Sequence, residues 1–184
     1  MIHLPSWLLI GAAGRNAGKT ALACALIARR RPVAAVKITV VQPGIRECPR
    51  GGDGCGVCSS LGSTPFWIRP EADPASPKDT SRLLAMGAAP VLWLCTRQDA
   101  LPEALEALLP RIPPDLPVIA ESNSLRHHAI PSLFLMVRLA GDRATKPSAR
   151  AVLPHVDRLV RSDGATFDLD PDDVLFEDGV WRLA

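Results

Sequence analysis

The residues of this chain that could do chemistry begin at residues 13–20, which read Ala-Gly-Arg-Asn-Ala-Gly-Lys-Thr. Their order matches the phosphate-binding P-loop pattern, in which Ala or Gly is followed by any four residues and then Gly-Lys-Thr. In such a loop the backbone N–H groups point at phosphate oxygens, the lysine reaches the β- and γ-phosphates, and the hydroxyl ligates Mg²⁺. The candidate nucleotide-binding residues are Ala13, Gly14, Arg15, Asn16, Ala17, Gly18, Lys19 and Thr20, with Thr20 also the candidate Mg²⁺ ligand.

The segments on either side of this loop favour the same interpretation. The apolar run at residues 7–10 is typical of a buried strand, and residues 21–28 are rich in strong helix formers. A strand, a glycine-bearing turn and a helix N-terminus are the setting in which backbone N–H groups converge on a phosphate. The alternative is a chance turn before an apolar helix, and the register of the three segments argues against it.

A nucleotide site of this kind also needs an acidic group that holds Mg²⁺ through water or orients the attacking atom. Glu121 directly follows the apolar run 118–120, so we expect its carboxylate at the carboxyl edge of a sheet, where ligands bind. Asp79 and Asp99 compete with it, although either could serve only as a helix cap. We favour Glu121 as the catalytic and magnesium-binding carboxylate over a plain surface glutamate, and we keep Asp79 as a nucleotide-site candidate.

Lys37 places a charge inside the apolar run 33–41. Burying an unpaired ammonium costs several kcal/mol, so a buried Lys37 needs an anionic partner. That partner could be a bound phosphate or Glu121. The alternative, which we weigh equally, is a lysine at the last exposed position of an edge strand.

A second sharp feature is a loop rich in glycine and cysteine at about residues 42–63, which contains Cys48, Cys55 and Cys58. Thiolates at this spacing suit Zn²⁺, Cu⁺ or an iron–sulfur cluster. Cys95, a dimer mate, water or a substrate could fill a fourth position. The alternative is three free thiols, or a redox disulfide between Cys55 and Cys58. Cys24 and Cys95 themselves are typical of core residues.

Composition limits the class of protein. The chain has 184 residues, of which 47% are hydrophobic and 22% charged, so we expect one domain spanning residues 1–184. A net charge of +2 gives no case for nucleic-acid binding. No apolar stretch approaches the roughly 20 residues of a membrane span, and the N-terminus lacks the pattern of a signal peptide. We therefore expect a cytoplasmic protein with no membrane partner.

The order of apolar runs predicts an α/β fold with strands and helices alternating along the chain. We expect the three-layer P-loop NTPase architecture, with a mostly parallel sheet, helices on both faces and a C-terminal β-hairpin around the Asp178-Gly179 pair. The predicted strands are 7–10, 33–41, 66–68, 91–95, 118–120, 133–139 and 158–160, and the predicted helices are 21–28, 78–86, 101–109 and 148–156.

Residues 6–125 resemble the molybdopterin-guanine dinucleotide biosynthesis protein B family of small P-loop proteins. The resemblance rests on the P-loop, on Lys37, and on residues 78–88, Lys-Asp-Thr-Ser-Arg-Leu-Leu-Ala-Met-Gly-Ala, which are similar to the family's K-D-S-x-R-x-x-x-A-G-A stretch. It implies a nucleotide-binding homodimer that assists a partner enzyme in attaching GMP to the molybdenum cofactor. The chain departs from the family in lacking histidines after the second strand, where the cysteine loop follows, and in having Ser122 after Glu121.

These features together predict Mg²⁺-dependent binding of ATP or GTP, with slow hydrolysis that serves the assembly of a metal or a metal cofactor. Lys19 and Glu121 are the expected catalytic residues, and without an arginine finger in the chain the turnover is expected to be slow. Two alternatives remain open. One is a ligase of the dethiobiotin-synthetase type, and the other is a nucleotide-gated metal-binding module without catalysis.

Overall fold

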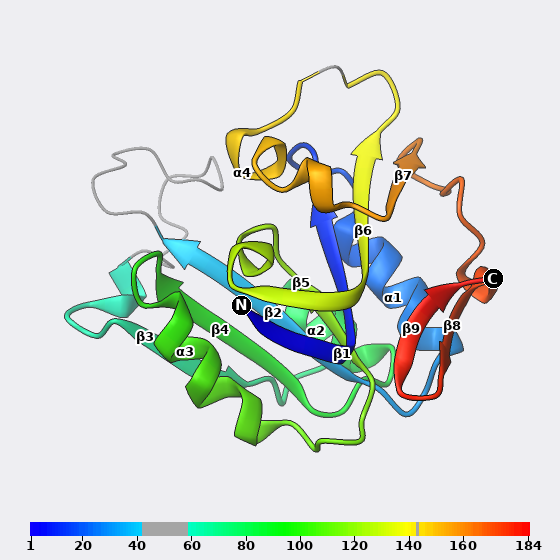
Figure 1. Ribbon diagram of the computed structural model, residues 1–184. Helices are drawn as coiled ribbons and strands as arrows, with labels where there is room; N and C mark the ends of the chain where they lie inside the picture. Colours follow the sequence, from blue (N-terminus) through cyan, green and yellow to red (C-terminus); the bar gives the residue numbers. More distant parts are fainter. Residues whose placement is uncertain (42–58, 143) are drawn as a thin grey trace.

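The structure is a computed structural model that describes residues 1–41, 59–142 and 144–184. A seven-stranded sheet forms the centre of the molecule, and a two-stranded hairpin lies at the C-terminal end (Figure 1). The large sheet contains β1 (Ile2–Ala12), β2 (Ala34–Val41), β3 (Phe66–Pro70), β4 (Val91–Arg97), β5 (Val118–Glu121), β6 (Ala129–Leu139) and β7 (Arg158–Ser162). The helices are α1 (Lys19–Arg29), α2 (Asp79–Ala85), α3 (Leu101–Leu108) and α4 (Pro147–Arg150), with short 3₁₀ turns η1 (Ser59–Leu61), η2 (Leu109–Arg111), η3 (Ser124–His127), η4 (Leu153–His155) and η5 (Pro171–Asp173).

The sheet is parallel apart from one edge. Its order is β3-β4-β2-β5-β1-β6-β7, and only the pairing of β3 with β4 is antiparallel. The carboxyl ends of parallel strands meet at one edge of a sheet, so the residues that follow β1, β2, β5 and β6 are brought together there. The predicted α/β class, the mostly parallel sheet and the C-terminal hairpin are confirmed.

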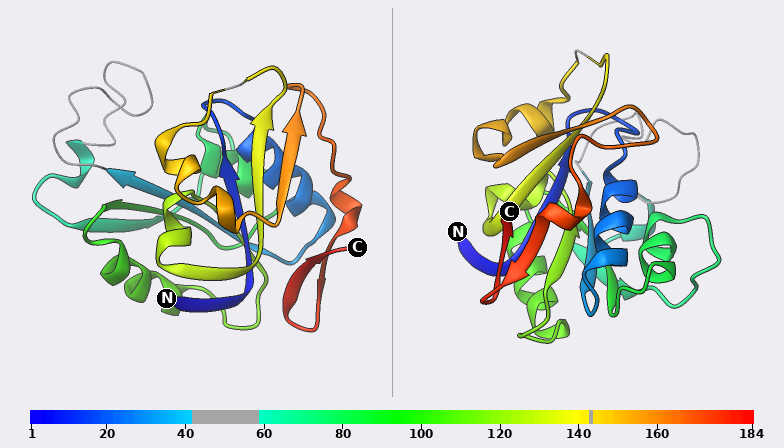
Figure 2. Two further views of the ribbon diagram at one scale, coloured as in Figure 1. Left: turned by 45° about the horizontal axis from the view of Figure 1, so that its top comes forward. Right: turned by 90° about the vertical axis from the view of Figure 1, so that its right-hand side faces the viewer.

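Apolar side chains cover both faces of the sheet because successive residues of a strand point to opposite sides. In β1, Leu9 belongs to the core beneath α3 and α4, whereas Leu8 and Ile10 belong to the core beneath α1 and α2. The right-hand view of Figure 2 shows α1 and α2 on one side of the sheet and α4 on the other. Within the described part of the chain, no helix is both long and apolar enough to cross a membrane.

The hairpin of β8 (Val174–Glu177) and β9 (Val180–Leu183) forms where the Asp-Gly pair predicts it. Asp178 and Gly179 have φ angles of 52° and 78°, the left-handed conformations that a two-residue hairpin turn requires. Trp181 fixes the hairpin to the sheet, because the residue is 2% exposed and its Nε1 donates a hydrogen bond of 2.9 Å to the Ser6 carbonyl oxygen.

One of the predicted elements is wrong. Residues 148–156 were predicted to form one helix, but α4 ends at Arg150 and the short turn η4 follows it. An α-helix cannot continue through Pro154 because proline has no N–H to donate. In the simplest winding, consecutive parallel strands lie side by side, but here β5 lies between β1 and β2. The insertion of β5 matters for function because it places Glu121 between the other two strands.

Candidate functional site

The glycine loop, residues 13–20, joins the carboxyl end of β1 to the N-terminus of α1. Gly18 is the residue before α1 and has a φ of 94°, a backbone conformation that residues with a side chain rarely adopt. A methyl group at Gly14 would meet Asp142 Oδ2 at 2.5 Å, so the Asp142 side chain lies directly against this turn of the loop. Ala13 is anchored on both its polar groups: its N–H donates to the Val137 carbonyl oxygen at 2.8 Å, and its carbonyl oxygen accepts from Lys146 N at 2.9 Å.

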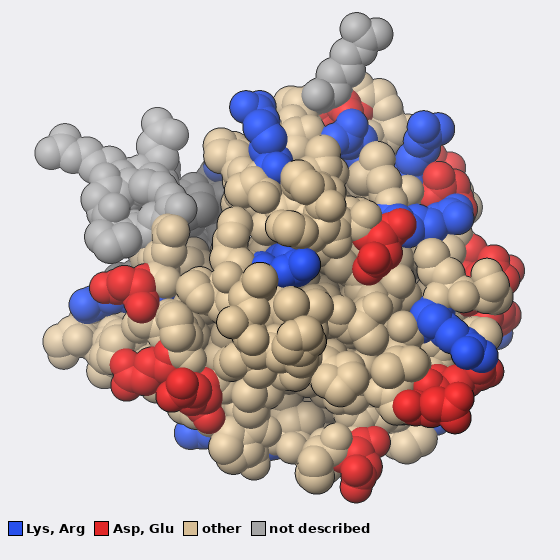
Figure 3. Space-filling model, in the orientation of Figure 1, with Lys and Arg blue, Asp and Glu red and all other residues tan. Residues whose placement is uncertain are grey.

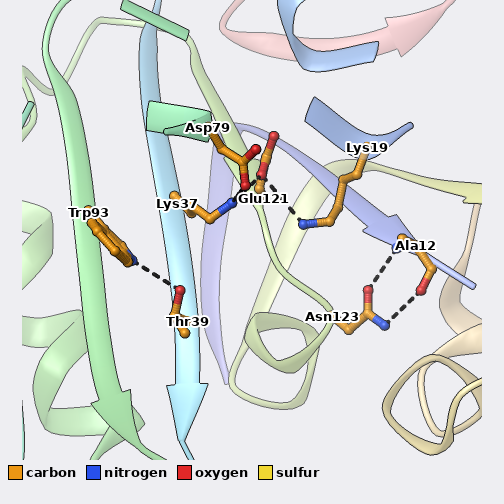
Figure 4. Close-up of polar contacts among 8 residues, drawn as sticks. All are labelled: Ala12, Lys19, Lys37, Thr39, Asp79, Trp93, Glu121 and Asn123. Atoms are coloured by element: carbon orange, nitrogen blue, oxygen red, sulfur yellow. Dashed lines mark hydrogen bonds and ion pairs between the residues drawn. The ribbon is translucent and has the colours of Figure 1, made fainter. Parts of the chain in front are cut away.

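Glu121 stands at the end of β5, and the register of the sheet aligns it with Ile10 of β1 and Lys37 of β2. The residue is 1% exposed. Its Oε2 lies 3.4 Å from Lys19 Nζ and 3.4 Å from Lys37 Nζ. Figure 4 shows the two ammonium groups reaching this carboxylate from opposite sides, one from α1 and one from β2. The structure thus brings together the residues that the sequence proposed separately.

The charge state of Glu121 follows from these neighbours. Burial raises the pKa of the carboxyl, but the positive charges of Lys19 and Lys37 and a hydrogen bond from Thr20 outweigh burial, and the pKa is lowered. The group is therefore a carboxylate at neutral pH. Its second oxygen, Oε1, is buried and has no hydrogen-bond partner among the described residues. A buried carboxylate oxygen without a partner is costly, and a bound cation or a water would satisfy it.

Lys37 lies in the interior of the sheet, and its side chain is 9% exposed. The equally weighted alternative of an exposed lysine on an edge strand is wrong, because β2 has β4 on one side and β5 on the other. The predicted anionic partner is present as Glu121, and the structure adds Asp79, whose Oδ2 pairs with Lys37 Nζ. Asp79 is the first residue of α2, and Lys78, not Asp79, is its N-cap.

Thr20 completes the group around Glu121. It is 8% exposed in the first turn of α1, and its side chain hydrogen-bonds to the Glu121 carboxylate. A hydroxyl next to a carboxylate with a free buried oxygen is an all-oxygen donor set of the kind that Mg²⁺ prefers. The residues therefore fit a magnesium ion held by Thr20 and Glu121.

Asn123 is a structural residue of the site that the sequence did not identify. Its Oδ1 accepts from the Ala12 N–H at 2.9 Å, and its Nδ2 donates to the Ala12 carbonyl oxygen at 3.1 Å. A side-chain amide has the same donor and acceptor as a peptide group, so Asn123 continues the pairing of β5 with β1 beyond the last residue of β5 (Figure 4). The residue immediately before the glycine loop is thereby fixed to the strand that carries Glu121.

We expect Asn123→Ala to reduce the free energy of unfolding by about 1–3 kcal/mol, because both backbone groups of Ala12 lose a buried partner. Chemical denaturation of the two proteins measures this difference. Ser124→Ala, one residue later, serves as the control and should change stability by less than about 0.5 kcal/mol. Equal stability of Asn123→Ala and the wild type would show that Ala12 finds other partners.

Lys146 lies beside the glycine loop at the start of the segment that follows β6. Its backbone N–H binds Ala13, and burial, followed by the charges of Lys19 and Arg15, lowers the pKa of its side chain to about 8. No motif in the sequence distinguishes Lys146. The side chains of Lys19, Arg15 and Lys146 thus place positive charge around the loop, which favours binding of an anion there.

The cysteine-loop prediction is not tested by this geometry. Cys48, Cys55 and Cys58 lie outside the described residues. Cys95 is fully buried in β4, as expected of a core residue, and Cys24 in α1 is half-buried. Asp99 was expected to cap a helix, but the N-cap of α3 is Ala100.

Comparison with known proteins adds no relative to this description. No protein-family model, curated protein or solved structure matches the chain.

Proposed function

We propose that this protein binds a Mg²⁺-nucleoside triphosphate, ATP or GTP, at the glycine loop and hydrolyses it slowly. The single observation that supports this most is the position of Glu121. A buried carboxylate with one free oxygen lies within reach of the loop lysine and the first-turn threonine, on the strand adjacent to β1. Strand, loop, helix and neighbouring acid together make up the parts that phosphoryl transfer requires.

In this proposal each residue has a separate task. The backbone N–H groups of residues 14–19 and the N-terminus of α1 hold the phosphates. Lys19 leaves Glu121 for the β- and γ-phosphates, and Lys37 remains to balance the carboxylate. A magnesium ion held by Thr20 and Glu121 would neutralise charge that develops on the γ-phosphate. Glu121 also orients the attacking water through its free oxygen.

The ion pairs of Lys19 and Lys37 explain how the site can be stable without a bound nucleotide. Two ammonium groups and the two carboxylates Asp79 and Glu121 balance one another. Because these charges are already compensated, the incoming polyphosphate exchanges one anionic partner of Lys19 for another. The buried site therefore never has to hold an unpaired charge, which would cost several kcal/mol.

We also infer a link to metal handling, which rests on the resemblance and on Cys48, Cys55 and Cys58. It extends the nucleotide proposal to the assembly of a metal or metal cofactor, with a homodimer and a cofactor-dependent enzyme as partners. Anaerobic purification followed by metal analysis and optical spectroscopy tests it. Loss of the metal in each single Cys→Ser variant supports the link, and metal at background level overturns it.

The nucleotide proposal is tested by titrating the full chain with ATP and with GTP, with and without Mg²⁺, and by following single-turnover hydrolysis of the bound nucleotide. Saturable binding strengthened by Mg²⁺, with phosphate released in the absence of any other substrate, is expected. Binding without any hydrolysis would support the nucleotide-gated binding module instead. No binding of either nucleotide would overturn the proposal.

A ligase of the dethiobiotin-synthetase type is the second candidate, and one observation favours it. A cavity of about 170 Å³ is lined by Lys37, Lys78, Asp79 and Trp93, among others. Figure 4 shows the Trp93 indole next to β2, where its Nε1 donates to Thr39 Oγ1 at 3.0 Å. A ligase would release phosphate only when a small acid substrate occupies such a cavity, so hydrolysis without that substrate distinguishes the two functions.

The lowered pKa of Lys146 predicts how nucleotide affinity depends on pH. Above pH 8 the free protein loses the Lys146 proton, and its favourable charge with it. We expect nucleotide affinity to fall by about tenfold between pH 7 and pH 9.5, the value of one charge-assisted hydrogen bond. Calorimetry across this range measures the change. Over the same interval the unfolded chain binds more protons than the folded chain, so the contribution of Lys146 to stability rises with pH.

The matched control is Lys146→Arg, because arginine keeps its charge throughout this pH range. Its nucleotide affinity should vary by less than about twofold from pH 7 to pH 9.5. The same decline in wild type and in Lys146→Arg would assign the titration to another group.

A further inference from the structure

A cavity of about 330 Å³ lies where β6 and β7 end, away from the carboxylate site. It is lined by residues 138–142 together with Leu159 and Arg161. Figure 1 places this end of the sheet at the top of the molecule, where Figure 3 shows both basic and acidic side chains. Among the described residues, none of the glycine loop is part of the lining, so the proposed function leaves this cavity unexplained.

Two arginines of the cavity lie side by side. Arg138 of β6 and Arg161 of β7 are register partners in a parallel pair, so both side chains leave the same face of the sheet from neighbouring strands about 4.8 Å apart. Like charges in that position repel each other. Such a pair is favourable when an anion binds between the two groups.

The hydrogen bonds of the two guanidinium groups leave donors free. Arg138 Nη2 donates to Thr145 Oγ1 at 2.9 Å, but its Nε is buried and has no partner among the described residues. Arg161 is exposed, and within the described part of the chain its side chain has no ion pair or hydrogen bond. A guanidinium has five N–H donors, so the cavity offers an unfilled set of donors from two directions.

The one acidic side chain in the lining offsets only part of this charge. Asp142 is the one carboxylate in the lining, and its Oδ1 already accepts from the Ala144 N–H at 2.9 Å. Asp168 lies next to β7 but uses its Oδ1 to accept the backbone N–H of Arg161 at 2.7 Å. The lining therefore has one more positive than negative charge and includes a buried donor without a partner.

We propose that this cavity is a second anion site, in which Arg138 and Arg161 bind a phosphate or carboxylate group of a small molecule. The chemistry is that of paired guanidinium forks, which match an anion with adjacent oxygen acceptors. The apolar side of Leu159 and a volume larger than a single phosphate leave room for the body of the molecule. This proposal does not depend on nucleotide binding at the glycine loop.

The site contacts the glycine loop through one short segment. Asp142 lines the cavity and also lies against Gly14, and Lys146, four residues later, binds Ala13. An anion in the cavity attracts Arg138 and repels Asp142, and a shift of Asp142 would change what the loop contacts. Occupancy of the second site is therefore expected to change nucleotide affinity at the first.

The test is an NMR titration of the full chain with inorganic phosphate, carried out in Lys19→Ala so that the glycine loop does not contribute. We expect saturable shifts at the amides of residues 139–142. Arg161→Gln in the same background should weaken binding by about tenfold or more, since hydrogen bonds between charged groups are lost. Arg161 is exposed, so this change should not affect folding.

Arg158→Gln is the matched control, because Arg158 is an exposed arginine of the same strand that does not line the cavity. It removes the same charge and should weaken phosphate binding by less than about twofold. Equal losses in Arg158→Gln and Arg161→Gln, or no saturable shifts in Lys19→Ala, would overturn the second site while leaving the nucleotide proposal intact. Repeating the titration with malonate distinguishes the source: binding of phosphate alone supports a phosphate ester, and binding of malonate supports a carboxylate.

Discussion

Lys19→Ala is expected to weaken binding of Mg²⁺-ATP or Mg²⁺-GTP by about a hundredfold or more. In the proposed complex its ammonium group donates to oxygens of two phosphates, and each charge-assisted hydrogen bond contributes about 1.5–3 kcal/mol. Losing about 2.8 kcal/mol of binding free energy corresponds to a hundredfold rise in Kd. Isothermal titration calorimetry of the wild type and the variant measures this ratio directly.

The fold should survive this change. The Lys19 side chain is 24% exposed, and Glu121 keeps Lys37 as a partner when Lys19 is removed. Lys78→Ala is the matched control: Lys78 is an exposed lysine outside the glycine loop, and its removal should change nucleotide affinity by less than about threefold. Unchanged affinity in Lys19→Ala, with the variant folded, would refute a phosphate site at residues 13–20.

Glu121→Gln is expected to leave nucleotide affinity within about fivefold of the wild type and to slow single-turnover hydrolysis by about a hundredfold or more. The amide keeps the size of the side chain and one acceptor, but it loses the charge that holds Mg²⁺ and orients water. A fall in the hydrolysis rate at nearly constant affinity is the signature of an interaction made in the transition state. Rapid-quench measurement of phosphate release after binding separates the two quantities.

The loss of stability at acidic pH gives an independent test of the charge on Glu121. The pKa of Glu121 is lower in the folded protein than the ordinary glutamate value of 4.5, so its contribution to stability is present above that value. As the pH falls through the folded pKa, this contribution is lost. Glu121→Gln should therefore show a weaker decline in stability below about pH 4.5 than the wild type does.

Glu103→Gln is the control for both measurements. Glu103 is an exposed glutamate of α3, which packs on the face of the sheet opposite to α1. It should leave hydrolysis unchanged and affect stability by less than about 0.5 kcal/mol. Wild-type hydrolysis in Glu121→Gln would leave Glu121 with a structural role only, as the counter-charge of Lys37 and Lys19.

Local sequence was sufficient to predict most elements of the fold. The apolar runs before and after the glycine loop became β1 and α1, because a buried strand and a helix each require a local pattern of apolar residues. The Asp178-Gly179 turn could also be predicted from the sequence, because Asp and Gly readily adopt the two positive φ angles that such a turn requires. The helix predicted across Pro154 was wrong because the proline effect outweighed the helix formers around it.

Most of the site residues could also be identified from the sequence, but how they lie relative to one another could not be predicted. A lysine inside an apolar strand predicts an anionic partner, yet the sequence offered only Glu121 or a phosphate for Lys37. The structure added Asp79 because α2 begins next to β2. Asn123 gave no signal in the sequence, because its role depends on lying opposite the end of β1.

The sequence by itself determined which segments are strands and helices, where the glycine loop lies, and which residues are charged within apolar runs. These properties depend on neighbours a few positions away. Only the tertiary structure decided that β5 lies between β1 and β2, and with it that Glu121 lies between Lys19 and Lys37. Strand order depends on contacts between residues about a hundred positions apart. The most stable order is the one that packs side chains best on both faces of the sheet at once. No local pattern of residues specifies that balance.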